Sequence, residues 1–177
     1  METFRIGDKQ FEALLAKEEI ATRIKQLASE INRDYKSQSL HIVSVLNGAF
    51  MFTTDLLKEI TVACKVFFTR PHDEDEPYQV SEITNMKVVG KQFKGKQVLI
   101  LEDIIDSGIS LEQVINDISE HKPASIKVAS LIVKKDVAMK MPDYTGFLIE
   151  NKFVLGYGMD YQGYGRNLGN IYIEVNA

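Results

Sequence analysis

The sequence predicts an α/β protein in which a mainly parallel, twisted β-sheet is flanked by helices. Three observations favour this class: short apolar runs alternate with segments of helical periodicity, the runs are rich in β-branched residues, and turn signals separate the two. Parallel strands are buried on both faces and therefore read as continuous apolar runs. A chain of 177 residues fits a single domain over residues 1–177.

The first half of the chain contains two predicted helix and strand pairs. Apolar residues at helical spacing predict a helix over 17–35, and the β-branched run at 40–46 predicts a buried strand. The Asn47-Gly48 pair ends that strand as a turn signal. A second helix over 49–60 and a second strand over 64–69 follow.

The second half repeats the alternation after an interruption. The segment 70–82 has two prolines and four consecutive acids at Asp73–Glu76, which predicts an exposed loop. Beyond it we expect a strand at 97–101, a turn at 102–108, a helix ended by Pro123, and strands at 125–133, 146–149 and 170–175.

Composition narrows the classes of function. A formal net charge of −4 argues against a general binder of nucleic acid or of anionic membranes. The single cysteine, Cys64, excludes an intrachain disulfide and is expected to be buried and inert in its strand. The N-terminal residues have no apolar signal-peptide core, and no apolar run is long enough to span a membrane. We therefore expect a cytoplasmic protein.

The strongest candidate site is VLILEDIIDSGISL at 98–111. A strand runs into Glu102-Asp103, and open α/β sheets bind ligands at this carboxyl edge. Two adjacent buried carboxylates need a cation or hydroxyl donors, which a divalent metal and a sugar diol would supply. The alternative is a solvated turn.

The residues that follow open a helix and suit a phosphate. Gly108 lets the backbone approach a ligand closely, Ser107 and Ser110 offer hydroxyls, and the helix N-terminus offers free N–H groups. The alternative is that Asp106 or Ser107 only caps the helix.

Four ordered blocks of the chain resemble one family. The segment VLILEDIIDSGIS resembles the phosphoribosyl-pyrophosphate signature of type I phosphoribosyltransferases and is most similar to the hypoxanthine-guanine branch. Residues 43–57, 127–135 and 151–168 resemble the family's pyrophosphate loop, purine-facing strand and C-terminal hood. The resemblance implies the type I phosphoribosyltransferase fold, with a small hood formed by about 1–10 and 146–177.

The resemblance also implies roles for individual residues. Asp106 would be the general base near the purine N7, and Glu102 and Asp103 would hold the ribose hydroxyls. The 5′-phosphate would lie against Ser107, Gly108, Ile109 and Ser110. The pyrophosphate would meet Leu46, Asn47, Gly48 and Arg166. The purine would contact Lys134, Phe153, Val154 and Asp160. The implied cofactor is Mg²⁺, near Glu102, Asp103 and Asp160.

These roles have structural alternatives, which the residues alone leave open. Gly48 could be an ordinary turn glycine, Lys134 a solvated strand end, and Phe153 a core residue. Arg166 could be a surface ion-pair former and Asp160 a turn residue.

The implied activity is purine salvage. A magnesium-dependent enzyme would transfer 5-phosphoribosyl from phosphoribosyl pyrophosphate to N9 of hypoxanthine and guanine, giving IMP or GMP and pyrophosphate. The resemblance suggests a homodimer or homotetramer that binds neither nucleic acid nor membrane. One alternative is a regulator of the same fold that binds nucleotide and RNA, which would show a basic face. Another is a transferase for xanthine or a pyrimidine.

Two departures from the family pattern stand out. Many relatives have lysine where this chain has Asn47, so a cation near the leaving group is missing. The family's mobile loop usually carries a Ser-Tyr pair, which the acidic segment 70–82 lacks, although it contains Tyr78.

Overall fold

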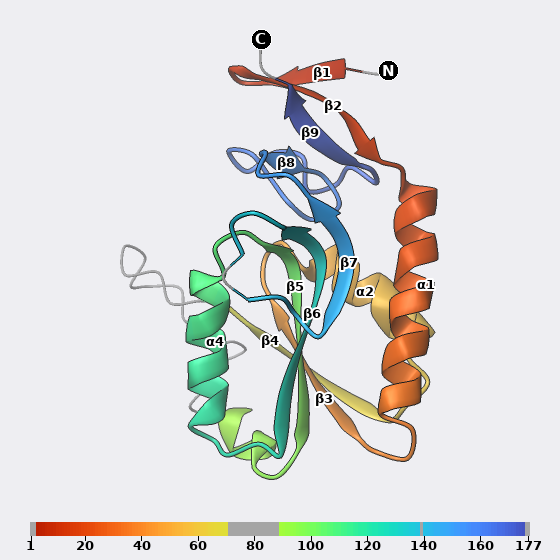
Figure 1. Cartoon of the computed structure of the whole chain (residues 1–177), viewed down its shortest axis with the longest axis vertical. Coiled ribbons are helices and arrows are strands. Elements are labelled where there is room, and N and C mark those ends of the chain that lie inside the picture. Colours follow the sequence, from red (N-terminus) through yellow and green to blue (C-terminus); the bar gives the residue numbers. More distant parts are fainter. Residues whose placement is uncertain (1–2, 71–88, 139, 176–177) are drawn as a thin grey trace.

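The computed structural model describes residues 3–70, 89–138 and 140–175 of the chain (Figure 1). Its larger sheet has five strands in the order β4-β3-β5-β6-β7, and every pairing is parallel. This arrangement confirms the predicted α/β class. In chain order the strands are β3 (Leu40–Val45), β4 (Cys64–Thr69), β5 (Gln97–Ile105), β6 (Ser125–Lys134) and β7 (Tyr144–Ile149).

Helices cover both faces of this sheet (Figure 1). The helices α1 (Lys17–Asp34) and α2 (Phe50–Glu59) pack against one face, where Leu40 and Ile42 of β3 point. The helix α4 (Ile109–Ser119) packs against the other face, with Val43 and Val45. A short 3₁₀ helix, η2 (Gly90–Phe93), precedes β5. Because successive strand residues alternate between faces, β3 is buried on both faces and is mainly apolar, with His41 and Ser44 as its polar residues.

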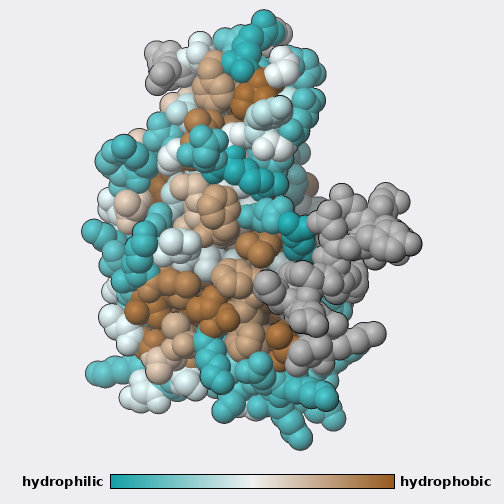
Figure 2. Space-filling view, turned by 180° about the vertical axis from the view of Figure 1, so that it is seen from behind, coloured by the Kyte–Doolittle hydropathy of each residue, from teal (hydrophilic) through white to brown (hydrophobic). Residues whose placement is uncertain are grey.

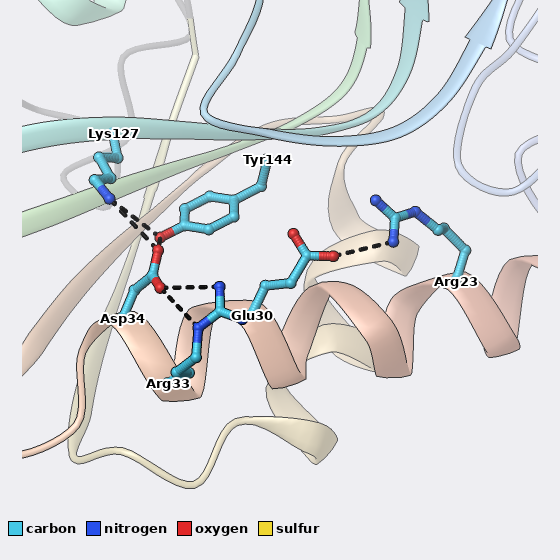
Figure 3. A network of polar contacts seen from close by, with 6 residues as sticks. All are labelled: Arg23, Glu30, Arg33, Asp34, Lys127 and Tyr144. Carbon is cyan, nitrogen blue, oxygen red and sulfur yellow. Dashed lines mark hydrogen bonds and ion pairs between the residues drawn. The ribbon is translucent and has the colours of Figure 1, made fainter.

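A polar network fastens α1 to the strands beside it (Figure 3). The Tyr144 hydroxyl donates to Asp34 Oδ2 at 2.8 Å, and Lys127 Nζ lies 3.7 Å from the same oxygen. Nearer the start of α1, Arg23 pairs with Glu30 at 3.1 Å. The Arg23 guanidinium also donates to two backbone oxygens of β7. These contacts hold the helix parallel to the sheet without entering the candidate site.

A second, antiparallel sheet lies beyond the carboxyl ends of the larger one (Figure 1). Its order is β1-β2-β9-β8, with β1 (Thr3–Ile6), β2 (Lys9–Leu15), β8 (Val154–Leu155) and β9 (Ile171–Val175). We call this sheet and its loops the hood. The expected hood limits need correction, because β2 extends it to Leu15, whereas residues 146–149 pair with β6 in the larger sheet.

Three local expectations were wrong. The turn expected at 102–108 begins later, since β5 continues to Ile105 by pairing with β6. The strands β1 and β2 were not expected at all. Cys64 is exposed rather than buried, because β4 is the edge strand of its sheet. The acidic residues 73–76 and Tyr78 lie outside the described residues, and within the described ranges no helix is long and apolar enough to cross a membrane.

Candidate active site

The turn between β5 and α4 exposes backbone donors at the carboxyl edge of the sheet. Gly108 has φ 92° and is the N-cap residue of α4, and no side chain caps this helix. Only glycine adopts such a φ without strain. The N-cap residue is therefore neither Asp106 nor Ser107, although Ser107 Oγ accepts the Ile109 N–H at 3.4 Å. The helix dipole favours an anion at this N-terminus.

Two adjacent carboxylates, Glu102 and Asp103, lie near the carboxyl end of β5. Glu102 is 8% exposed, and its Oε2 has no hydrogen-bond partner among the described residues. Burial and the neighbouring charge of Asp103 raise the pKa of Glu102. Burial also raises the pKa of Asp103 to about 6, although backbone hydrogen bonds and Arg166 oppose this. A buried acid pair of this kind is stabilised by a cation or by hydroxyl donors.

The loop after β3 approaches Asp103 so closely that it requires glycine. A Cβ atom built on Gly48 would lie 1.7 Å from Asp103 Oδ2, a distance that no real contact allows. The same loop contains a cis peptide between Leu46 and Asn47. On its other side, a Cβ on Gly158 would lie 2.0 Å from the Gly48 carbonyl oxygen. Gly48 is therefore more than a turn residue: it lets the loop, β5 and the hood meet.

Lys134 points into the site from the end of β6. It is 7% exposed, and its Nζ lies 2.5 Å from Asp106 Oδ2. The alternative of a solvated strand end is thus wrong. A buried ammonium beside a half-exposed carboxylate places one obligate donor next to one obligate acceptor.

The hood supplies the remaining side chains. Arg166 pairs with Asp160 at 2.6 Å and donates through Nη1 to the Gly158 oxygen at 2.8 Å. The half-buried Phe153 ring contacts Tyr161 edge to face, with centroids 5.5 Å apart, and Lys9 Nζ lies 4.7 Å from the Phe153 centroid. Both Arg166 and Phe153 combine a structural contact with a position in the site.

These segments enclose a pocket of about 250 Å³. Most of the side chains singled out from the sequence line this pocket. Leu46, Glu102 and residues 107–110 are not among the lining residues, but they adjoin lining residues in the sequence. Three residues of the site were not predicted from the sequence. Ile104 and Met159 line the pocket, and the Arg70 side chain donates a hydrogen bond to Asn47. The lining residues are Asn47, Gly48, Asp103, Ile104, Asp106, Lys134, Phe153, Val154, Met159, Asp160 and Arg166.

The carboxylates do not form a complete metal site by themselves. Among the described residues, no three histidine, cysteine or acidic side chains are grouped closely enough to hold an ion. Asp160 is also committed, since one oxygen contacts Arg166 and the other accepts the Gly163 N–H at 2.7 Å. A metal ion here would need oxygens from water or from a ligand.

A parallel sheet whose carboxyl edge presents an acid pair and a helix N-terminus, covered by a small sheet, is suited to a phosphorylated sugar. A sequence model of the phosphoribosyl transferase domain matches residues 10–162, and the chain belongs to this family.

Within the family, the chain is similar to enzymes of one branch. It is 32% identical to the hypoxanthine-guanine phosphoribosyltransferase of Aquifex aeolicus, covering 95% of this chain and 97% of that protein. It is 35% identical to the hypoxanthine-guanine-xanthine phosphoribosyltransferase of Tritrichomonas foetus, over 88% of this chain and 86% of that protein. The crystal structure of the Trypanosoma cruzi hypoxanthine phosphoribosyltransferase superposes with a TM-score of 0.80 at 32% identity, covering 92% and 95% of the two chains. These matches confirm the type I phosphoribosyltransferase fold expected from the sequence.

Proposed function

We propose that this chain is a purine-salvage enzyme that transfers 5-phosphoribosyl from phosphoribosyl pyrophosphate to N9 of hypoxanthine and guanine and releases pyrophosphate. The observation that carries the proposal is the contact between Lys134 and Asp106 in the pocket. A 6-oxopurine with a proton on N7 presents an acceptor and a donor side by side. Lys134 can only donate and an ionised Asp106 can only accept, so the pair matches that edge.

Asp106 is proposed as the general base. As N9 attacks the sugar, the purine becomes positively charged, and a carboxylate that accepts the N7 proton makes N9 a better nucleophile. The Asp106 side chain is 56% exposed, so a purine can reach it without rearrangement of the backbone. Lys134 would then contact the 6-oxo group, and the Val154 backbone would meet the other edge of the base.

Phe153 is proposed to stack on the purine. Its ring is held by Lys9, whose Nζ lies 4.7 Å from the ring centroid, and by the edge-to-face contact with Tyr161. The ring also lines the pocket, where a flat base would gain a contact worth about 1–3 kcal/mol by stacking. Phe153 therefore has packing contacts and a ligand face at once.

The phosphorylated sugar is proposed to lie along the carboxyl edge of β5. The amides of residues 107–110 and the hydroxyls of Ser107 and Ser110 would bind the 5′-phosphate, and Glu102 and Asp103 would accept hydrogen bonds from the ribose hydroxyls. The loop Leu46–Gly48 and Arg166 would bind the pyrophosphate group.

Magnesium is proposed as the cofactor. The unpartnered Glu102 Oε2 and the raised pKa of Asp103 fit a nearby cation, and carboxylate oxygens are ligands that Mg²⁺ prefers. Mg²⁺ is usually held by one or two carboxylates together with substrate phosphates and water, which agrees with the incomplete protein site. When bound, the ion would neutralise charge on the departing pyrophosphate. Asp160 is proposed near a second ion.

The proposal is tested by a spectrophotometric assay with phosphoribosyl pyrophosphate, magnesium and one base at a time. We expect turnover with hypoxanthine and guanine. Turnover with xanthine or uracil but not with hypoxanthine would instead support a transferase for one of those bases. The name of the Tritrichomonas relative includes xanthine. No turnover with any base would contradict the enzyme assignment.

A regulator that binds RNA is the second candidate, and one observation favours it. Lys65, Lys91, Lys94 and Lys96 line a groove of about 590 Å³ at the opposite edge of the sheet, where β3 and β4 begin. The intact pair of Asp106 and Lys134 favours the enzyme. Filter binding of single-stranded RNA at low and at physiological salt separates the two, and we expect no retention at physiological salt.

We also propose a homodimer or homotetramer in the cytoplasm, with the whole chain as one domain. Apolar side chains gather on the lower part of the face seen in Figure 2, where they are suited to a subunit contact. Light scattering at several protein concentrations measures the subunit number.

A further inference from the structure

The candidate active site has more acidic than basic side chains in its lining. In the described part of the chain, three aspartates line the pocket, with Lys134 and Arg166 as the basic residues. Each of these two cations is paired with one of the aspartates, Lys134 with Asp106 and Arg166 with Asp160. Pyrophosphate is strongly negative and gains most from positive charge close to its oxygens. A cation beside the loop Leu46–Gly48 would therefore stabilise bound pyrophosphate in addition to the proposed Mg²⁺.

Arg70 brings a guanidinium group to that loop. Its Nη2 donates to Asn47 Oδ1 at 2.5 Å, and Asn47 lines the pocket. The larger sheet fixes this geometry, because Val45 and Thr69 are partners in the last pairing of β3 with β4. The Leu46 N–H also donates to the Thr69 oxygen at 2.8 Å. Asn47 and Arg70 thus follow two strand ends that are held together by backbone hydrogen bonds.

The contact also determines how Asn47 is oriented. Because arginine has no acceptor, the Asn47 atom that it touches must be the carbonyl oxygen. The two N–H donors of the Asn47 amide then point away from the guanidinium. They can donate to a ligand oxygen in the pocket that Asn47 lines.

We propose that Arg70 and Asn47 together bind the leaving pyrophosphate, with Arg70 supplying the charge and Asn47 a neutral donor that Arg70 orients. This pair takes the place of a single lysine at position 47. The inference rests on the proposed function, because it requires phosphoribosyl pyrophosphate to be the substrate.

The test compares Arg70→Gln, Arg70→Lys and the double variant Asn47→Lys with Arg70→Gln. Steady-state kinetics give KM for phosphoribosyl pyrophosphate, KM for hypoxanthine, and the inhibition constant of pyrophosphate as product. For Arg70→Gln we expect KM for phosphoribosyl pyrophosphate and the pyrophosphate inhibition constant to rise on the order of tenfold, since a charge-assisted hydrogen bond is lost. KM for hypoxanthine should stay unchanged. Arg70→Lys should lose less, and the double variant should recover most of the loss.

Arg33→Gln is the matched control, because it removes an exposed arginine whose partner, Asp34, lies on α1 away from the pocket. It should leave all three constants unchanged. If Arg70→Gln is folded by circular dichroism and leaves both pyrophosphate-dependent constants at the wild-type value, the inference is wrong. An equal rise in KM for hypoxanthine would also overturn it, since a general distortion would then explain the result. Wild-type protein without turnover would instead contradict the proposed function.

Discussion

Replacement of Lys134 by methionine tests base recognition directly. Lys134 is 7% exposed and contacts Asp106 at 2.5 Å, so it cannot turn to solvent when no purine is bound. Methionine keeps an unbranched side chain of similar length but removes the charge and the donor. The 6-oxo group of hypoxanthine would lose one hydrogen bond to a charged donor, worth about 1.5–3 kcal/mol. The value of kcat/KM for hypoxanthine should therefore fall by roughly 10–150-fold.

Adenine carries a 6-amino group, which is a donor and gains nothing from Lys134. The variant should leave kcat/KM for adenine almost unchanged, so that the ratio between hypoxanthine and adenine falls by the same factor. Phe153→Leu is the contrasting variant, because stacking depends little on the exocyclic group and both bases should weaken together. The assay is kcat/KM for the two bases in the two variants. An unchanged ratio in Lys134→Met would refute the reasoning, even if both rates fall.

Three further predictions concern the other side chains of the site. Asp106→Asn should lower turnover by roughly 10²–10⁴-fold, the usual effect of losing a general base, while the amides of residues 107–110 still bind phosphate; near-normal turnover would remove Asp106 from the mechanism. Excess EDTA should abolish activity, and Mg²⁺ or Mn²⁺ should restore it; full activity in EDTA would contradict the role given to Glu102 and Asp103. Gly48→Ala should abolish turnover, because its Cβ would lie 1.7 Å from Asp103 Oδ2. Ala49→Gly, at the next position, is its control for chain flexibility, and equal activity of the two variants would show that the loop adapts.

The larger sheet could be predicted from the sequence because its signal is local. The strands β3 and β6 are largely buried on both faces, so each appears as a mainly apolar run with several β-branched residues between turn signals. The helix α4 was predicted from apolar spacing within its own length, and its N-cap, Gly108, is the glycine of the motif.

Of the hood strands, β9 was expected at 170–175, whereas β1, β2 and β8 could not be predicted in the same way, because they depend on distant partners. The strand β2 pairs with β9 from the other end of the chain, as Gln10 with Val175, and it mixes charged residues with apolar ones. Likewise, Glu102 and Ile104 belong to β5 only because they pair with Ser130 and Ile132 of β6. Local composition does not report such pairings.

Part of the candidate site was equally difficult to predict from local sequence patterns. Lys134 stands beside Lys135 and resembles a solvated strand end, yet it is buried and contacts Asp106, 28 positions earlier. The resemblance to a known family supplied the role proposed for Lys134 where local patterns could not. Arg70 was missed because the loop it supports belongs to a different strand, and the two meet only through the parallel pairing of β3 with β4.

The strand order of the hood has a consequence for how the protein is made. The strand β8, directly after Phe153, joins the rest of the hood through β9, while β2 pairs with the other edge of β9 and β1 pairs with β2. A ribosome delivers β9 later than both of its partner strands and later than β1. A nascent chain can therefore complete the five-stranded sheet and the turn after β5 while the hood side of the pocket is still open. The side of the pocket proposed to bind the base forms after the side proposed to bind the phosphate.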